Sequence, residues 1–478
     1  MSAQASTTLE NAYHPRLLSS PVILLLQALV SAAGLVVEII AGRMLAPYVG
    51  MSVYSWTAVI AVVLAGFSVG HWIGGVFAER PRQHSLGMIA MALGLAATTT
   101  AMTIPILRLA SGPILSSTPD AGLAILALAS IIVFLPSFFA GIPSPVLAKT
   151  IVDLRPAGPG KALGAIFAAG SIGAIIGTLA AGFLFISWLG STLTLSMIAL
   201  TYVISAIVLL FMGGTLKHRI VVVISIGITL IITAYNLSLG TVCTRESQYY
   251  CIRIVDFTPE LGTSAKLMVL DHLGHGINLE DYPEELITPY VALIDLYVQN
   301  RFGGVPASSF FIGGGAYTLP RAWKAASPDA TITVGEIDPE VTKLAQDQMW
   351  LSGTGINILH GDARVTLRQV QKRYHTIIGD AFTDIAAPPH LVTYEFFHLI
   401  KARLKNGGLY AMNVVDHVPN LPALLAIHRT QEAVFNHVEV FAEEGDFLSG
   451  GRTTFVLFAS DEPSGHDHLV DQNGQVYA

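Results

Sequence analysis

The sequence predicts two parts of different fold class: an all-α polytopic membrane bundle of about seven spans, followed by an α/β doubly wound domain with a small β-rich lead-in. The 478 residues are 52% hydrophobic and only 12% charged, which is too apolar for an ordinary globular protein. The apolar excess lies almost entirely before Asn236, and beyond it short apolar strands alternate with helical stretches. We therefore divide the chain into a transmembrane part (1–240), a lead-in with a linking helix (241–305) and an α/β domain (306–478).

Nearly charge-free runs of about twenty residues recur through the first half, and each can cross the roughly 30 Å hydrocarbon core of a bilayer. They lie at 21–40, 53–77, 86–107, 121–147, 163–188, 192–212 and 220–235. The first run lacks a small-residue cleavage site and more spans follow it, which argues against a removable signal peptide. We expect an integral protein of a bacterial inner membrane, with the lipid bilayer as a partner. The net charge of −7 argues against nucleic acid.

The distribution of basic residues predicts the orientation of these spans. One side carries Arg16, Arg80, Arg82, Lys149, Arg155, Lys161, Lys217 and Arg219, whereas the other carries little beyond Arg43 and Arg108. The positive-inside rule then places the N-terminus in the cytoplasm, and an odd number of spans places the second half outside. Cys243 and Cys251, just past the last span, would pair in an oxidising compartment. One missed span reverses this result, so the sequence leaves the side of the second half open.

A polar stripe on the first helix predicts a protein-facing or cavity-facing surface. Gln27, Ser31, Gly34 and Glu38 follow i, i+4, i+7, i+11 spacing. An ionisable Glu38 inside a span is a functional-site hypothesis, with Arg43 or His71 as its partner, and a purely structural contact is the alternative. Two runs of small residues predict close helix packing: Gly66, Gly70 and Gly74, and then Ala169, Gly173, Gly177 and Ala181.

Strand–helix alternation in the second half predicts a doubly wound, Rossmann-like sheet. Two lead-in strands are expected at 252–257 and 266–270. Core strands are expected at 310–315, 331–338, 357–362, 376–380, 408–415, 438–442 and 453–459, with a helix at 318–326 and another beginning at Pro339. In such a sheet the ligand binds beyond the carboxyl ends of the strands.

Four of these strand ends carry polar or glycine residues suited to an adenosyl ligand. Gly313, Gly314 and Gly315 let the backbone approach a ligand closely. Glu336 can accept hydrogen bonds from both ribose hydroxyls, and Asp362 with Ala363 can hold an adenine amino group. Asp380 would face the reacting end of the ligand. Because no Walker lysine motif is present to suggest ATP, we expect an S-adenosyl compound as co-substrate and no metal.

The segments around these strand ends resemble the spermidine synthase (polyamine aminopropyltransferase) family. The matching segments are 311–315 (FIGGG), 334–339 (VGEIDP), 361–363 (GDA), 377–382 (IIGDAF) and 393–397 (TYEFF), within roughly 246–459. The first half, with Glu38, Gly42-Arg43 and 45–50 (LAPYVG), resembles the transporter-like membrane domain fused to such proteins. The resemblance implies that Glu336 binds the ribose, Asp362 the adenine, and Asp380 orients the attacking amine.

The chain also departs from the family pattern around the amine pocket. Ala316 replaces an Asp that helps to hold the donor's amine, and the Tyr-His-Glu segment reads Tyr282-Pro283-Glu284. The remaining candidates for the substrate pocket are Tyr250, His275, Tyr282 and Asp384.

Three functions therefore remain open from the sequence. The leading one is a membrane-anchored S-adenosyl-dependent transferase that transfers an aminopropyl or related alkyl group, uses S-adenosylmethionine or its decarboxylated form, and releases methylthioadenosine. The second is a methyltransferase or a self-cleaving lyase. The third is a transporter or sensor that binds an adenosyl compound or polyamine without turnover. The sequence also leaves open whether the chain forms a homo-oligomer.

Overall fold

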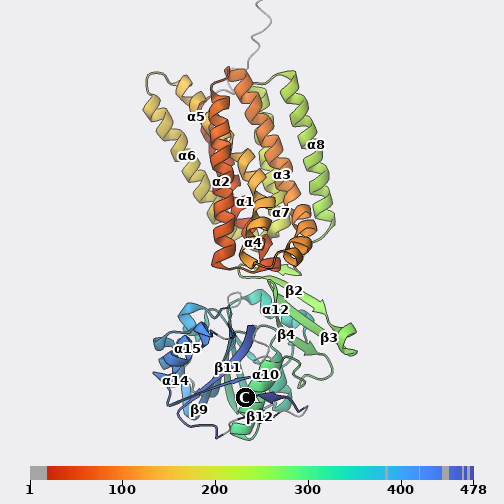
Figure 1. Cartoon of the computed structure of the whole chain (residues 1–478), viewed down its shortest axis with the longest axis vertical. Helices are drawn as coiled ribbons and strands as arrows, with labels where there is room; N and C mark the ends of the chain where they lie inside the picture. The colour runs from red at the N-terminus through yellow and green to blue at the C-terminus, as the bar shows by residue number, and fades with distance from the viewer. Residues whose placement is uncertain are drawn as a thin grey trace, which may run out of the picture. The chain divides into compact units, whose positions relative to one another are not determined.

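The computed structural model describes residues 19–382, 386–418, 420–443, 452–465, 468–470 and 474–477. The chain folds into two compact units, Met1–Cys251 and Ile252–Ala478, each described by itself below (Figure 1).

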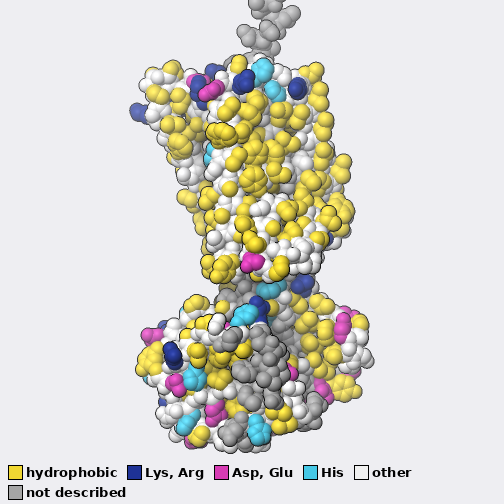
Figure 2. Space-filling view, viewed as in Figure 1, with side chains coloured by type: hydrophobic (Ala, Val, Ile, Leu, Met, Phe, Trp, Pro, Cys, Tyr) yellow, Lys and Arg dark blue, Asp and Glu magenta, His cyan; other side chains and the backbone are white. Residues whose placement is uncertain are grey.

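The first unit is a helical bundle. Its elements are α1 (Ser20–Val49), α2 (Val53–Ala78), α3 (Arg82–Ser117), α4 (Ala121–Gly141), α5 (Pro143–Leu154), α6 (Pro159–Ala180), the π-helical turn η1 (Ala181–Phe185), α7 (Ile186–Met212), α8 (Leu216–Ser238) and the short strand β1 (Arg245–Glu246). Within the described residues, six helical stretches are long and apolar enough to cross a membrane. Figure 2 shows hydrophobic side chains over the flank of this unit, with Lys and Arg gathered at one end.

One of the six stretches, Pro159–Met212, makes two passes. It is 54 residues long, about 80 Å at 1.5 Å per residue, which is far more than a bilayer requires. Gly190 interrupts the helical backbone with φ 71° and ψ 173°. Before it, α6 runs parallel to α1, because Gly173 packs on Ala28 and Gly177 on Ala32.

The chain reverses at Gly190. Beyond it, the start of α7 shares a cavity with the ends of α1 and α3, and Gly213, just past the end of α7, packs against Leu86 near the start of α3. Hence α7 runs antiparallel to α3. With Pro159–Met212 counted twice, the six described stretches run along the bundle seven times, which matches the seven spans that the sequence predicts.

Small residues allow the helices to approach one another closely. A Cβ atom at Gly66 or Gly70 would meet the backbone of α4, and one at Gly74 would meet the backbone of Ile142, just after α4. A Cβ atom at Gly173 or Gly177 would meet the backbone of α1. These are the two faces that the sequence assigns to helix packing. Part of the polar stripe of α1 also packs against another helix. Gln27 and Ser31, in the first half of α1, lie against Gly170 of α6.

The second unit has a small antiparallel lead-in followed by a seven-stranded sheet. The lead-in strands are β2 (Cys251–Asp256), β3 (Ala265–Leu270) and β4 (Leu273–Leu279), with the short helix α9 (Thr258–Leu261) between the first two. The sequence did not predict β4, because its Gly274 and Gly276 lower β-propensity. In the large sheet the strand order is β10-β11-β9-β8-β5-β6-β7.

The strands of the large sheet are β5 (Ser308–Ile312), β6 (Thr331–Glu336), β7 (Asn357–His360), β8 (Tyr374–Gly379), β9 (Leu404–His417), β10 (His437–Ala442) and β11 (Arg452–Ser460). The helices of this unit are α10 (Pro289–Phe302), α11 (Thr318–Ala326), α12 (Pro339–Gln348), α13 (Ala363–Gln369), η2 (Pro389–Leu391), α14 (Tyr394–Arg403) and α15 (Pro422–Glu432). Two short strands, β12 (Leu469–Val470) and β13 (Val476–Tyr477), pair with each other.

The order of the strands places a ligand crevice beside β5. This strand pairs in parallel with β6 on one side and with β8 on the other. From β5 the chain proceeds outward to β6 and β7, and then crosses back to β8 and β9. At such a reversal the loops after the two central strands separate and leave a crevice at their carboxyl ends. Those loops carry Gly313–Gly315 and Asp380.

Candidate functional site

The glycine loop after β5 brings two strand ends into close contact. Gly313 has φ 94°, a conformation that favours glycine, and a Cβ atom there would collide with the backbone carbonyl of Asp380. The next residue, Gly314, donates its backbone N–H to Oε2 of Glu336 at 2.7 Å. The backbone of the loop therefore contacts both the Glu336 side chain at the end of β6 and the backbone of Asp380 after β8.

Glu336 is held in one orientation at the end of β6. Its side chain is buried, with 4% of the residue exposed. Besides Gly314, the backbone N–H of Asp338 donates to Oε1 at 2.8 Å. Burial raises the pKa of this carboxyl, and the backbone donors oppose the rise. Each oxygen still has a second lone pair, so the carboxylate can accept from two neighbouring hydroxyls.

Asp362 already has two partners. Its Oδ1 accepts from the backbone N–H of Val365 at 3.0 Å, which caps α13. Its Oδ2 lies 2.7 Å from Nε2 of His390 in η2. Ala363 is the first residue of α13 and is buried. An adenine amino group reaching this carboxylate would therefore share or replace the contact with His390.

Asp380 follows β8 and is held by two side chains from other elements. Oη of Tyr290, in α10, donates to its Oδ2 at 3.2 Å, and Nδ2 of Asn413, in β9, donates to its Oδ1 at 3.0 Å. Burial raises the pKa of this carboxyl to about 6, although the hydrogen bonds from Tyr290 and Asn413 lower it. Near neutral pH the group can exchange a proton with a bound substrate.

Two cavities meet at Asp380. One, of about 20 Å³, is bounded by Gly313 and Gly314 of the glycine loop. The other, of about 210 Å³, is bounded by Phe382, Asn413 and Arg452. Asp380, Tyr290 and His275 line both.

His275 adds no positive charge to these cavities near neutral pH. Burial, with a smaller contribution from His272, lowers the pKa of its imidazole to about 4. The charged side chains among the described lining residues of the larger cavity are therefore Asp380 and Arg452.

Of the other expected substrate-pocket residues, one is described within the second unit and lies outside both cavities. Tyr282 is 56% exposed and lines neither cavity. Tyr250 belongs to the first unit, where its backbone N–H donates to Oγ of Ser247 at 2.9 Å. Asp384 lies outside the described residues.

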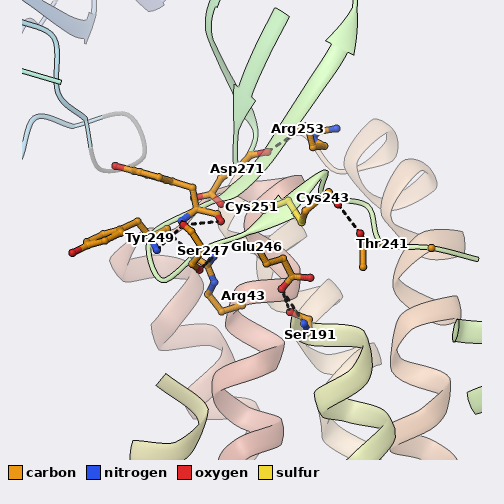
Figure 3. The surroundings of a disulfide bond; sticks show 12 residues. Arg43, Ser191, Thr241, Cys243, Glu246, Ser247, Tyr249, Cys251, Arg253 and Asp271 are labelled. Carbon is orange, nitrogen blue, oxygen red and sulfur yellow. Dashed lines mark hydrogen bonds between the residues drawn. A yellow bond between two sulfur atoms is a disulfide. The ribbon is translucent and has the colours of Figure 1, made fainter. Parts of the chain in front are cut away.

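The expected partners of Glu38 have other contacts. Arg43 donates from Nη1 to the carbonyl of Tyr249 at 2.7 Å and from Nη2 to that of Ser247 at 3.1 Å. His71 is exposed and stacks on Phe67, with ring centroids 6.1 Å apart. The pairing of Glu38 with Arg43 or His71 is thus not found. Cys243 and Cys251 form a disulfide with Cα atoms 5.3 Å apart (Figure 3).

Sequence reasoning missed four residues of the site: Tyr290, Asn413, Arg452 and His390. One of them had a usable signal. Asn413 is a lone polar residue in the buried apolar run of β9, and a buried amide needs a partner. Tyr290 lies in the first turn of α10 and His390 in the short helix η2. The sequence around them does not show which residues of other segments they contact.

Comparison with known proteins finds polyamine aminopropyltransferases and a methyltransferase among the similar proteins. No protein-family model matches the chain. A polyamine aminopropyltransferase of Corynebacterium efficiens is 24% identical over 476 residues, which cover 91% of this chain and 87% of that protein. One of Vibrio vulnificus is 26% identical over 159 residues, 31% of this chain and 53% of that protein. An N-terminal histidine N-methyltransferase of Emericella nidulans is 33% identical over 142 residues, 29% of this chain and 25% of that protein.

The chain therefore spans only a quarter to a half of the length of the last two relatives, but most of the Corynebacterium protein. Among solved structures, a probable spermidine synthase from Corynebacterium glutamicum superposes with a TM-score of 0.42 at 24% identity, covering 48% of this chain and 84% of that one. The second unit is an α/β Rossmann-like domain, and the first is a helical bundle. Curated polyamine aminopropyltransferases, which are transferases, are thus similar to this chain, one of them over nearly its whole length.

Proposed function

We propose that the protein is a membrane-anchored transferase that uses an S-adenosyl compound as alkyl donor and releases methylthioadenosine. The observation that carries the proposal is Asp380: a half-buried acid with a pKa of about 6 at the strand reversal, directly beside the glycine loop. Acids with a pKa near the working pH are suited to proton transfer.

The donor would bind along the carboxyl ends of β5, β6 and β7. Glu336 accepts from the two ribose hydroxyls through the lone pairs that Gly314 and Asp338 leave free. The carboxylate of Asp362 accepts a hydrogen bond from the adenine amino group, which replaces its contact with His390. In this arrangement the sulfonium would lie near Asp380, beside the cavity of about 20 Å³.

The reaction is a displacement at the carbon next to the sulfonium. The nucleophile's lone pair forms the new bond, the carbon–sulfur bond breaks, and sulfur keeps the electron pair, which leaves neutral methylthioadenosine. If the nucleophile is an amine, the new ammonium gives its proton to Asp380. Holding both reactants in line is the main catalytic device, because alignment can supply about 7–11 kcal/mol.

A second candidate reaction is favoured by Arg452, which shares the cavity of about 210 Å³ with Asp380. A guanidinium there suits a substrate that carries a carboxylate. S-Adenosylmethionine carries one, and its decarboxylated form does not. In self-cleavage, that carboxylate attacks the donor's own γ-carbon and releases methylthioadenosine and a lactone, with no proton transferred.

Product analysis tests both reactions on the full chain in lipid nanodiscs. The chain is supplied with either donor, with and without putrescine, and the adenosyl product is identified by mass spectrometry. We expect methylthioadenosine, and Asp380→Asn should lower its formation about 10²–10⁴-fold if an amine is the acceptor. Asp347→Asn, an exposed carboxylate on α12, is the matched control. Formation of S-adenosylhomocysteine would instead show a methyltransferase, and no turnover of either donor would contradict the proposal.

We also propose that the end of the helical unit bearing Arg80, Lys149 and Lys217 faces the cytoplasm and that the disulfide loop faces outside. Seven passes separate the start of α1 from the loop after α8, and the basic residues lie at the α1 end. A reporter fused after Ala478 tests this, since it reads the side of the C-terminus directly.

A further inference from the structure

A small cavity lies within the first unit, at the end of the bundle where the disulfide-closed loop 243–251 follows α8. Three helices contribute to it: α1 through Arg43, α3 through Arg108 and α7 through Ser191. Glu246 of the loop is the acidic residue of the lining, and Met44 and Leu107 are among its apolar residues. Figure 3 shows Arg43, Ser191 and Glu246 gathered beside the Cys243–Cys251 bond.

The cavity carries an excess of positive charge that no described carboxylate balances. Arg43, only 6% exposed, uses two N–H groups on loop carbonyls, and its buried Nε has no acceptor. Arg108 donates to the carbonyl of Gly240 at 2.6 Å, and its buried Nε also lacks an acceptor. Within residues 19–251 neither guanidinium forms an ion pair.

Glu246 does not neutralise the two arginines. Its Oε2 accepts from the backbone N–H of Ser191 at 2.9 Å and from the Ser191 hydroxyl at 2.6 Å. The carboxylate is thus held by the start of α7, and the three charged groups leave one net positive charge around the cavity. A buried guanidinium, Arg43, and a half-buried one, Arg108, that line the same cavity favour an anion between them, because removal from water strengthens both their repulsion and their attraction for it.

The size of the cavity limits what it can hold. Its volume is about 40 Å³, room for about three water molecules at roughly 10–15 Å³ each. A carboxylate or a phosphate group is of this size, whereas an adenosine moiety is much larger. The cavity is therefore a site for a charged group and not for a whole nucleoside.

We propose that this cavity, between Arg43 and Arg108, binds one small oxyanionic group, a carboxylate or a phosphate. The group belongs either to a soluble molecule or to a lipid headgroup at this end of the bundle. The site is independent of the proposed transferase reaction, since all its residues lie in the first unit.

The test measures thermal unfolding of the purified full chain in dodecyl maltoside, an uncharged detergent. Sodium phosphate, sodium acetate and short-chain phosphatidylglycerol are titrated separately, with sodium chloride keeping the ionic strength constant. A ligand that binds the folded state alone raises the unfolding midpoint in a saturable way, which gives an apparent affinity. A response to phosphate or acetate identifies a soluble ligand, and a response to phosphatidylglycerol alone identifies a headgroup.

Three variants separate a binding site from a structural one. Arg108→Gln should weaken the apparent affinity at least about tenfold, as expected when a charge-assisted contact is lost. Glu246→Gln should strengthen it, because a neighbouring negative charge is removed while a side-chain acceptor remains for Ser191. Arg219→Gln, an exposed cation of α8, should leave it unchanged. Arg43 is not the primary variant because it also holds the loop. No saturable effect of any probe, or equal affinities in wild type and Arg108→Gln, would overturn the proposal.

Discussion

Tyr290 donates its phenolic hydrogen bond to Oδ2 of Asp380 at 3.2 Å, across a separation of 90 residues. The contact joins the first turn of α10 to the loop after β8, and Asn413 of β9 holds the other carboxylate oxygen. The two donors favour the charged form of the acid, whereas burial favours the neutral form and raises its pKa to about 6. The balance between them sets the pH at which Asp380 can accept a proton.

The first prediction concerns that pH dependence. Because Asp380 must be ionised to accept a proton, turnover at saturating donor should rise with pH through a midpoint of about 6. The ionised fraction, and with it the rate, should increase about tenfold between pH 5 and pH 7. Asn413→Ala removes a donor that favours the charged form, so it should move the midpoint to higher pH. An unchanged midpoint in Asn413→Ala would assign the profile to another group, such as the attacking amine.

The second prediction concerns donor binding. Glu336→Gln should lower the affinity for an S-adenosyl ligand about ten- to a hundredfold, the ~1.5–3 kcal/mol of a charge-assisted hydrogen bond. Calorimetric titration of the full chain with S-adenosylmethionine or methylthioadenosine measures this affinity. Asp347→Asn, an exposed acid of α12, is the control. Equal affinities in wild type and Glu336→Gln would remove Glu336 from the ribose site.

The third prediction tests helix packing in the bundle. A Cβ atom at Gly70 would meet the backbone of Phe138 in α4, whereas one at Gly75 would meet nothing within 4 Å. Gly70→Ala should therefore destabilise the protein by about 1–3 kcal/mol through overpacking, and Gly75→Ala on the same helix should be neutral or slightly stabilising. Unfolding in detergent, followed by circular dichroism, compares the two. Similar stabilities would mean that α2 and α4 lie farther apart than the structure has them.

The fourth prediction concerns the disulfide and the compartment. If the loop 243–251 faces outside, Cys243 and Cys251 should be oxidised in the cell, because thiols are kept reduced only in the cytoplasm. Intact-mass analysis after thiol blocking in the membrane, with and without prior reduction, counts the free thiols. Cys243→Ser supplies the single-thiol reference. Two blocked thiols without reduction would place the loop on the cytoplasmic side.

The fifth prediction concerns Glu38, which is half-buried in α1 and has no ion pair or hydrogen bond within the described residues. An unpaired carboxylate in a span costs ~2.5–3.5 kcal/mol, so Glu38→Gln should leave the protein at least as stable as wild type. If the helices carry a cationic amine or sulfonium, the same change should abolish its flux in proteoliposomes. If the variant transports the cation as fast as wild type, or if wild type transports none, α1 has a structural role only.

The sequence by itself determined the two fold classes, the seven passes and the strand ends that carry Gly313, Glu336, Asp362 and Asp380. These follow from local patterns: hydrophobic length sets a span, alternation sets a strand, and parallel strands align their carboxyl ends. Only the tertiary structure decided which side chains surround those residues. Tyr290, Asn413 and His390 reach the site from distant segments, and Arg43 turns to the loop carbonyls of Ser247 and Tyr249 instead of to Glu38. Such contacts depend on how separate elements pack against one another, which no local periodicity records.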